Sequence, residues 1–411
     1  MYKRRFVYDL AKLSFSWRLD KLRFVGVMMI REKLENLYDI GSSKRVFQSE
    51  WRSEGVPFYR AREIAKLAID DYIDNELFID EELYDSYVKK YGKPQPGDIM
   101  VTGVGTLGVC YIVKPNDKFY FKDGNILWFK QKAPDRILPE YLVRLFDSND
   151  VREFISKNSS GTTVGTFTIQ TAKKLEINLP SLEEQKSIIQ KLTKVENIIN
   201  NRRRELILLD DCIKARFVEM FGDRLVNDRG WISKAIAECM TFHNGKAHEQ
   251  VIDENGKFVL VTSRAIASDF KDVRKTNSML FSLRKNDIVM VMSDVPNGQA
   301  LAKCQIIDQD NKFTLNQRIC CFNEYNSTFN NVFLLNLINR HPYFLSFNDG
   351  NGQTNLRKDD ILKCNLIVPP MELQNKFACY VDQIDKSKFA VQKLLEETQL
   401  LFDKLMQEYF G

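Results

Sequence analysis

The sequence has few of the residues that metal centres and secreted folds need. It contains three histidines and eight cysteines, and no two cysteines form a CxxC pair. A zinc site of ordinary ligand spacing is therefore not expected, and scattered cysteines are typical of reduced thiols in a cytosol. No apolar run reaches the ~18 residues of a membrane span. Charges interrupt the apolar positions of residues 1–17, which argues against a secretory signal. We expect a cytoplasmic protein with no membrane segment and no metal.

Motifs of catalysis and cofactor binding are also missing. The sequence has no Walker A motif, no Asn-Pro-Pro-aromatic motif of a methyltransferase, and no recognisable nuclease site. Gly103, Gly105 and Gly108 do form a literal GxGxxG after a predicted strand. The next segment, VCYIV, is itself a predicted strand, whereas the dinucleotide fingerprint must open a helix. We interpret the glycines as a turn between strands, and we expect no catalytic residue and no bound cofactor.

Length and charge leave several function classes open. The chain of 411 residues is long enough for several domains, and its 44% hydrophobic content supports sizeable cores. The formal net charge is only +5. This balance alone does not argue for nucleic acid, although a basic groove could be hidden within such an average.

Residues 179–222 form the longest strongly periodic stretch, and no glycine or proline occurs between Ser181 and Phe221. Its apolar positions alternate at spacings of four and three, which is the heptad pattern of a helix that packs against another long helix. The seam consists of Ile188, Leu192, Val195, Ile199, Arg202, Leu206, Leu209, Ile213, Arg216 and Met220.

The same stretch recurs at the end of the chain, 189 positions later. Pro180 then coincides with Pro369, Gln185 with Gln374, Phe221-Gly222 with Phe410-Gly411, and Asp98-Ile99 with Asp287-Ile288. Two unrelated coiled-coil helices would not keep this spacing across a whole intervening domain, so the sequence indicates an internal duplication. The second seam consists of Phe377, Val381, Ile384, Lys388, Val391, Leu395, Thr398, Phe402, Leu405 and Tyr409.

The order along the chain is globular unit, helix, globular unit, helix. Residues 1–29 have no counterpart in the second half and are expected to be an extension of unclear role. In the first unit we predict strands over 96–102, 108–113 and 124–130, and a helix over 138–155. In the second unit we predict strands over 257–263, 286–293 and 317–322, and a helix over 329–347.

The two long stretches open with LPSLEEQ and VPPMELQ and both close in Phe-Gly, and the first contains ARFVEMFGD. With the duplication, these features resemble the specificity subunits of type I restriction-modification systems. The second opening departs from the family pattern, with Met371-Glu372-Leu373-Gln374 where Leu-Glu-Glu-Gln is usual. The resemblance implies an α+β fold with two similar mixed α/β target recognition domains, each followed by a long helix. The two helices would pair as an antiparallel coiled coil.

The resemblance also implies domain boundaries and partners. The first recognition domain would span 30–178, the first conserved helix 179–222, the second recognition domain 223–367 and the second helix 368–411. Each recognition domain would read one half of a split site in double-stranded DNA. The helices would set the spacing and dock two methyltransferase (modification) subunits, which restriction (motor-nuclease) subunits join. The complex would be a site-specific deoxyribonuclease and DNA adenine methyltransferase, in which the partners use S-adenosylmethionine, ATP and Mg²⁺ and this chain has no active site.

Polar residues recur at loop-like places in both halves, flanking corresponding strands. Such side chains suit both phosphate anchoring and the reading of base edges. The candidate DNA-binding residues are Lys44, Arg45, Arg52, Tyr59, Arg60, Arg62, Thr102, Thr106, Thr162, Thr163, Lys246, His248, Arg264, Ser293, Asn297, Gln299, Asn351, Gln353 and Arg357.

Duplication and heptads alone would also permit a protein of another class. That alternative is a non-DNA-binding scaffold or adaptor, with duplicated protein-binding domains on a coiled coil. Salt-sensitive binding to duplex DNA would distinguish the two, because phosphate contacts release counterions.

Overall fold

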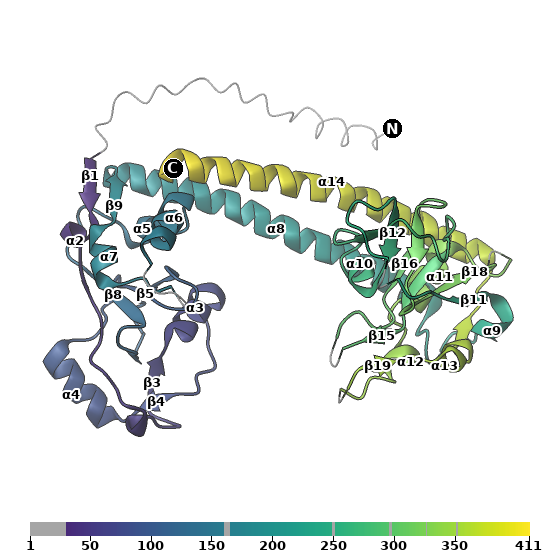
Figure 1. Ribbon diagram of the computed structural model, residues 1–411, viewed down its shortest axis with the longest axis horizontal. Coiled ribbons are helices and arrows are strands. Elements are labelled where there is room, and N and C mark those ends of the chain that lie inside the picture. The colour runs from purple at the N-terminus through teal and green to yellow at the C-terminus, as the bar shows by residue number, and fades with distance from the viewer. Residues whose placement is uncertain (1–29, 160–164, 249–250, 296–297, 326, 351) are drawn as a thin grey trace, which may run out of the picture. The chain divides into compact units, whose positions relative to one another are not determined.

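The computed structural model describes residues 30–159, 165–248, 251–295, 298–325, 327–350 and 352–411 (Figure 1). The expected extension over 1–29 lies outside these ranges. The chain forms two compact units: unit 1 runs to Ile199 and includes Glu397–Gly411, and unit 2 comprises Asn200–Glu396. Each unit therefore combines one globular part with a portion of both long helices.

The globular part of unit 1 mixes short strands and helices. Its strands are β1 (Ile30–Lys33), β2 (Tyr38–Gly41), β3 (Val56–Tyr59), β4 (Phe78–Ile79), β5 (Ile99–Thr102), β6 (Cys110–Ile112), β7 (Tyr120–Phe121), β8 (Ile126–Gln131) and β9 (Glu176–Leu179). Its helices are α2 (Leu34–Leu37), the 3-10 turn η1 (Gln48–Glu50), α3 (Ala61–Asp70), α4 (Glu81–Tyr91), α5 (Pro139–Phe146), α6 (Asn149–Asn158) and α7 (Ile169–Lys174).

The central sheet of unit 1 has the strand order β2-β8-β5-β6 and is antiparallel throughout. All four residues of β5 are buried, because each face of the sheet has its own core. Ile99 and Val101 face one core, and Met100 faces the other, as the two-residue period of a strand requires. A second sheet has the order β4-β3-β7, in which β3 and β7 are parallel. β1 pairs with β9.

The globular part of unit 2 contains a similar series of elements. Its strands are β10 (Ser233–Ala235), β11 (Thr241–Asn244), β12 (Phe258–Val261), β13 (Arg274–Thr276), β14 (Ile288–Val291), β15 (Ser293–Asp294), β16 (Cys304–Ile306), β17 (Phe313–Leu315), β18 (Ile319–Asn323), β19 (Thr354–Asn355) and β20 (Asn365–Ile367). Its helices are α9 (Ile236–Cys239), α10 (Ser263–Ala267), α11 (Asn331–Ile338), α12 (Pro342–Leu345) and α13 (Lys358–Leu362).

The topology of unit 2 repeats that of unit 1. The order β11-β18-β14-β16 matches β2-β8-β5-β6, and β13-β12-β17 matches β4-β3-β7, including one parallel pair. β10 pairs with β20 as β1 pairs with β9. Independent folds would not share three sheets with the same orders and directions. The duplication predicted from the spacing is therefore confirmed, as is the mixed α+β class.

The strands predicted from the sequence are present, whereas each predicted helix is divided in two. The stretch 138–155 forms α5 and α6, because Ser148 ends one helix and its side chain caps the next by accepting a hydrogen bond from the amide of Val151. The stretch 329–347 forms α11 and α12, because Arg340 has a left-handed backbone and Pro342 opens a new helix. Both expectations of one continuous helix were wrong.

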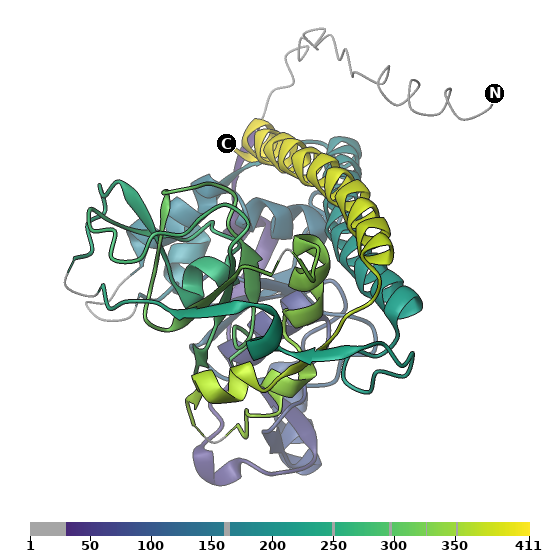
Figure 2. The ribbon, with the colours of Figure 1, turned by 90° about the vertical axis from the view of Figure 1, so that its right-hand side faces the viewer.

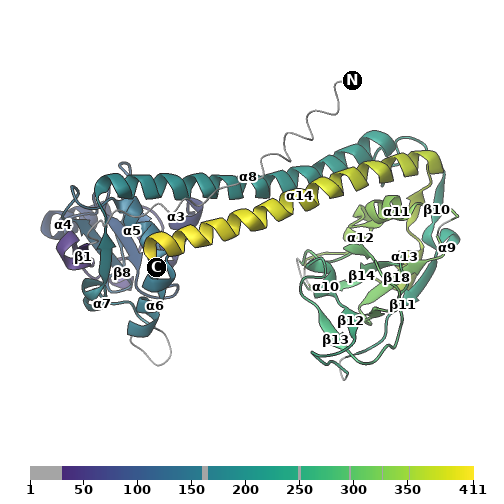
Figure 3. The ribbon, with the colours of Figure 1, turned by 90° about the horizontal axis from the view of Figure 1, so that it is seen from above.

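Two helices of forty residues, α8 (Leu182–Phe221) and α14 (Met371–Phe410), follow the globular parts. All twenty predicted seam residues are buried or half-buried. In unit 1, the Lys191 ammonium lies 3.4 Å from the Tyr409 hydroxyl. In unit 2, the rings of Phe217 and Phe377 are 5.5 Å apart. Early residues of one helix thus meet late residues of the other within each unit, as expected for antiparallel pairing (Figures 2 and 3).

The sequence explains where α8 begins and ends. Ser181 and Glu184 form a reciprocal capping box, in which the carboxylate accepts from the Ser181 amide at 2.9 Å and the hydroxyl accepts from the Glu184 amide at 3.3 Å. At the other end, Gly222 has a φ of 80°, a left-handed conformation that favours glycine. A buried glutamine, Gln185 in α8 and Gln374 in α14, joins each helix start to its own globular part.

Candidate nucleic-acid interface

A group of candidate residues in unit 1 is joined by hydrogen bonds around the first turn of α3. Glu63 is only 2% exposed, and its carboxylate accepts hydrogen bonds from the backbone amide of Arg60 at 2.8 Å and from its Nη2 at 2.6 Å. Nε of Arg62 donates to the same carboxylate. Burial by itself raises the pKa of Glu63, but the hydrogen bonds from both guanidiniums outweigh it and hold the pKa below the ordinary value. One buried charge thus fixes two arginine side chains.

A cavity of about 500 Å³ opens beside these arginines. Arg60 and Arg62 line it together with the turn Val104–Thr106. This turn belongs to the GxGxxG segment, and it joins the antiparallel strands β5 and β6, as interpreted from the sequence. Gly105 and Gly108 have φ angles of 72° and 78°, which explains why glycine is used there. The structure therefore brings together Arg60, Arg62 and Thr106, which the sequence had only placed in separate segments.

The corresponding place in unit 2 is built from different side chains. Thr262 caps α10 by accepting a hydrogen bond from the amide of Ala265 at 3.2 Å. Arg264 is exposed and lies 3.6 Å from the carboxylate of Asp272. At the next candidate loop, the Gln353 amide donates to the Ser293 hydroxyl at 2.6 Å, since β15 pairs with β19. Ser293 and Gln353 are therefore neighbours.

Besides Ser293, which is also buried, two further candidates occupy interior positions. The Thr102 side chain is 1% exposed, donates to the carbonyl of Thr106 and accepts from the amide of Val109 at 3.0 Å, so it holds the turn together. His248 is fully buried, between the carbonyl of Lys246 at 2.8 Å and the Thr314 hydroxyl at 3.1 Å. Neither side chain reaches the surface in this conformation, which corrects the expectation that they contact DNA. The residue type of a polar side chain does not show whether its hydrogen bonds are made inside the protein or to DNA.

The remaining candidates of unit 1 lie on or near the surface of its second sheet and loops. Arg45 pairs with Asp123 at 3.1 Å, and Arg52 pairs with Asp80 at 2.7 Å. Lys44 lies over the ring of Tyr91, 5.9 Å from its centroid. Tyr59 stacks on Phe119 at 4.9 Å, and burial raises its pKa. These contacts leave the cations exposed and available to a large anionic partner.

The other candidates of unit 2 are exposed and lie on separate segments. Lys246 follows β11, Gln299 precedes β16, and Arg357 precedes α13 as its N-cap residue. The structure does not bring these three into contact with one another through any hydrogen bond within the described ranges. The candidates Thr162, Thr163, Asn297 and Asn351 lie outside the described residues.

Two residues near the candidate interface were missed. Asn125 lines the cavity beside Arg60, and its carbonyl accepts from the amide of Gly103 at 2.8 Å. Glu63 positions the two arginines. It was missed because its negative charge is opposite to the charge expected of a residue that contacts DNA. A glutamate three residues after the helix start is a capping signal, and it could have identified Glu63 as a partner of Arg60.

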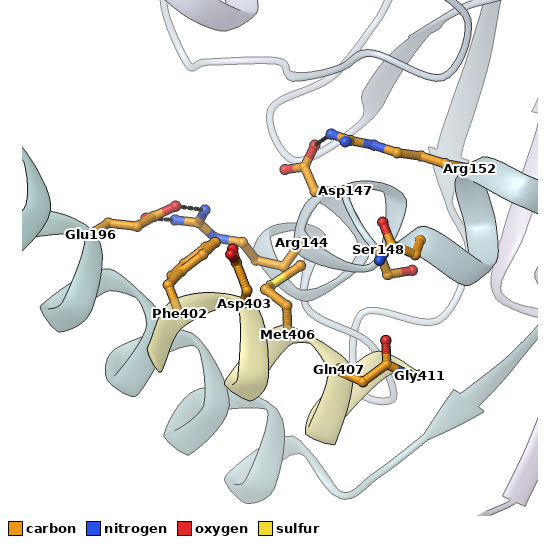
Figure 4. A pocket seen from close by; sticks show the side chains of 11 residues that line it. Arg144, Asp147, Ser148, Arg152, Glu196, Phe402, Asp403, Met406, Gln407 and Gly411 are labelled. Carbon is orange, nitrogen blue, oxygen red and sulfur yellow. Dashed lines mark hydrogen bonds and ion pairs between the residues drawn. The ribbon is translucent and has the colours of Figure 1, made fainter. Parts of the chain in front are cut away.

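A second cavity of unit 1, of about 610 Å³, lies where α5 and α6 meet the long helices (Figure 4). Arg144 of α5 makes a bidentate ion pair with Glu196 of α8, and Arg152 pairs with Asp147 at 3.1 Å. Met406 of α14 lines the same space. Because both guanidiniums are paired with carboxylates, we interpret this region as the attachment of the globular part to the helices.

Two kinds of site are absent from the part of the chain that the structure describes. No group of three or more histidine, cysteine or acidic side chains is arranged there to hold a metal ion. No helix there is long and apolar enough to cross a membrane.

Residues 31–209 and 228–399 match the family described as type I restriction modification DNA specificity domain. The chain belongs to this family. A putative type I restriction enzyme specificity subunit of Haemophilus influenzae is 30% identical over 224 residues, which are 53% of each protein. The chain thus spans about half the length of that relative. The type I restriction enzyme MjaIX specificity subunit of Methanocaldococcus jannaschii is 20% identical over 97% of this chain and 93% of that protein.

Solved structures of the specificity family share the fold. The crystal structure of a type I restriction-modification system S subunit from M. genitalium has a TM-score of 0.51 and 15% identity, with 94% of this chain and 98% of that chain covered. A chain from a study of complex assembly and conformational transition in a type I system has a TM-score of 0.58 and 14% identity, with 93% and 97% covered. The predicted family, the two similar domains and the long helices are thereby confirmed.

Proposed function

We propose that the chain is the DNA sequence-recognition subunit of a type I restriction-modification enzyme, and that each globular part reads one half of a bipartite site. The observation that carries the proposal is the repeated topology, in which three sheets of unit 2 reproduce those of unit 1. Two copies of one scaffold in a single chain can present similar surfaces to two half-sites, in the way that a dimer does.

The candidate contacts support two half-sites of different sequence. At the start of α3 and α10, Arg60 and Glu63 in unit 1 take the places of Thr262 and Ala265 in unit 2. The second residue of both helices is an arginine, Arg62 in α3 and Arg264 in α10. The two units thus share one cation at this place but differ in the neighbouring polar groups. This pattern is consistent with a DNA-backbone contact that both half-sites share and with base contacts that differ between them.

We propose that the paired helices set the distance between the half-sites and dock two methyltransferase subunits. Their seams are covered, but apolar side chains remain exposed away from the seams. In unit 2, Phe389 is 75% exposed and Ile207 is 62% exposed. In unit 1, Leu400 is 61% exposed. Apolar residues on the outer faces of a coiled coil are typical of a surface that further helices cover.

The same proposal assigns the chemistry to the partners. Restriction subunits join the methyltransferase subunits, and these partners use S-adenosylmethionine, ATP and Mg²⁺ to methylate adenine and cleave DNA. This chain supplies sequence choice and no catalytic group, in the cytoplasm where the DNA lies. The scaffold that binds only proteins is the less favoured alternative, because it gives no reason for family membership over both halves.

Methylation mapping tests the proposal. The chain is expressed with its methyltransferase partner in a host lacking other modification, and the genome is read by long-read sequencing. We expect methylated adenines within a split motif, with two specified parts and an unspecified gap. An unsplit motif, or methylation that does not depend on this chain, would contradict the proposal.

A further inference from the structure

Arg60 is held so that one edge of its guanidinium is used and the other is free. Nε donates to the Glu63 carboxylate at 3.1 Å and Nη2 donates to it at 2.6 Å, which occupies the Nε/Nη2 edge. Nη1 has no hydrogen bond to any described residue, and Nη2 has a second hydrogen on that side. The free Nη1/Nη2 edge is a parallel pair of donors, the geometry that matches two acceptors at once.

The free edge belongs to a side chain that lines the 500 Å³ cavity beside α3. The Arg60 side chain is 27% exposed, and the lining residues include no acidic side chain. The side chain of Glu76, the other acid of the cluster, is 72% exposed, and its carboxylate lies 4.0 Å from Nη2 of Arg60, which is beyond hydrogen-bond distance. A partner that enters the cavity therefore meets a fixed cationic fork without a competing carboxylate on the wall.

The comparison of the two units separates Arg60 from Arg62. Arg62 has an equivalent in Arg264, and both side chains are well exposed, at 60% and 67%. Arg60 has no equivalent, since Thr262 stands at its place. A contact to phosphate is needed in both halves whatever the sequence, whereas a contact to a base is specific to one half-site.

Resting on the proposed function, we propose that Arg60 reads a guanine in the half-site recognised by unit 1, that Glu63 is the positioning residue for this contact, and that Arg62 is a phosphate anchor. Guanine presents O6 and N7 as two acceptors in the major groove, and a bidentate arginine is its commonest partner. The buried Glu63 selects the orientation of the fork before DNA arrives, so less side-chain freedom is lost on binding.

The test uses the complex of the full chain with its methyltransferase subunits and the duplex site found by methylation mapping. Binding is measured for Arg60→Lys, Glu63→Gln and Arg62→Ala against duplexes changed at each specified base pair, over a series of salt concentrations. Arg264→Lys is the matched control in unit 2. Circular dichroism and complex assembly verify that each variant folds.

We expect Arg60→Lys to lose about 5- to 150-fold in discrimination at one G·C pair of one half-site, with an unchanged salt slope because the charge is kept. Glu63→Gln should lose part of the discrimination at the same base pair. Arg62→Ala should weaken all sequences alike and reduce the salt slope by about one. Arg264→Lys should leave discrimination at that pair intact.

Three results would overturn the assignment: full discrimination by Arg60→Lys, a loss spread equally over all sequences, or a loss at a pair without guanine. If Glu63→Gln does not affect the base pair that Arg60→Lys affects, Glu63 is not its positioning residue. If the wild-type complex binds duplexes with neither sequence preference nor salt dependence, the proposed function itself fails, and this assignment with it.

Discussion

Gln185 and Gln374 stand 189 positions apart and make equivalent hydrogen bonds at the starts of the two long helices. The Gln185 amide donates to the carbonyls of Arg136 at 2.8 Å and Pro180 at 2.9 Å, and its oxygen accepts from the Leu138 amide at 2.9 Å. Gln374 does the same with Thr328, Pro369 and Asn330, at 3.1, 2.8 and 2.9 Å. Both side chains are fully buried. Each glutamine therefore joins a helix to its own globular part.

Replacing Gln185 with leucine should destabilise unit 1 more than unit 2. The change removes the partner of the Leu138 amide and of two carbonyls in a partly buried place, and a fully buried group left without a partner costs about 1 to 3 kcal/mol, which is the upper limit for each. Urea unfolding, followed by a probe in each unit, measures the effect. Gln190→Leu is the control, because Gln190 is exposed on the same helix. Equal stability of the two variants would show that Gln185 does not anchor the helix.

This pair also shows what could be predicted from the sequence. Its spacing relative to Pro180 and Pro369 revealed the duplication, because repeated landmarks need no knowledge of the folded contacts. The partners of the glutamine could not be predicted, since backbone groups of Arg136 and Leu138 carry no signature of their residue type. The burial of His248 could not be predicted either, because its partner Thr314 lies 66 positions away in the sequence.

The exposed ring of Phe389 gives a test of subunit docking. Phe389→Ser should reduce assembly with the methyltransferase subunits, because 75% of the side chain is exposed and its loss removes apolar area from the outer face of α14. Stability of the free chain should change little. Size-exclusion chromatography of mixed subunits measures assembly, and Lys386→Ser, at an exposed position three residues earlier, is the control. Unchanged assembly of Phe389→Ser would remove this face from the docking surface.

His341 should make the stability of unit 2 depend on pH. Burial, and then the nearby Arg224 cation, lower its pKa from 6.5 to about 4. The unfolded chain therefore gains a proton between these values that the folded chain does not accept, and stability falls as pH falls from 6.5 to about 4. The loss approaches roughly 3 kcal/mol.

His341→Asn is the variant that isolates this effect. Asparagine can accept the hydrogen bond that His341 Nδ1 receives from the Tyr343 amide at 3.2 Å, but it does not titrate. Urea unfolding of both proteins across the acid range should give curves that diverge as pH rises, with the wild type gaining relative to the variant. Parallel curves would show that the imidazole is not responsible.

Adding one heptad to both long helices should widen the gap between the half-sites. Insertion after Ile199 in α8 and after Glu396 in α14 keeps the seam in phase and lengthens each helix by about 10 Å. That length corresponds to roughly three base pairs of duplex DNA. Methylation mapping should return the same half-sites with a gap changed by a few base pairs, or a loss of binding at the old gap. An insertion in α8 alone should prevent assembly.

A double insertion that leaves both assembly and the original gap unaltered would show that the helices do not set the spacing.

The seam of the long helices could be predicted because its twenty positions follow a fixed period, and the structure shows all of them buried or half-buried. The first turn of α3 could not be predicted, because the role of Arg60 depends on Glu63 and on the turn at Val104–Thr106, which only the fold brings together.

If one chain carries two independent readers, exchanging one of them should change only the half-site that it reads. Residues 30–178 are replaced by the equivalent segment of a family relative with a known bipartite motif, and methylation is mapped by long-read sequencing in the same host. Wild type and chimera are expressed with the same methyltransferase subunits. We expect one half of the motif to change to that of the relative, while the other half and the gap remain. A change in both halves, or in neither, would contradict this expectation.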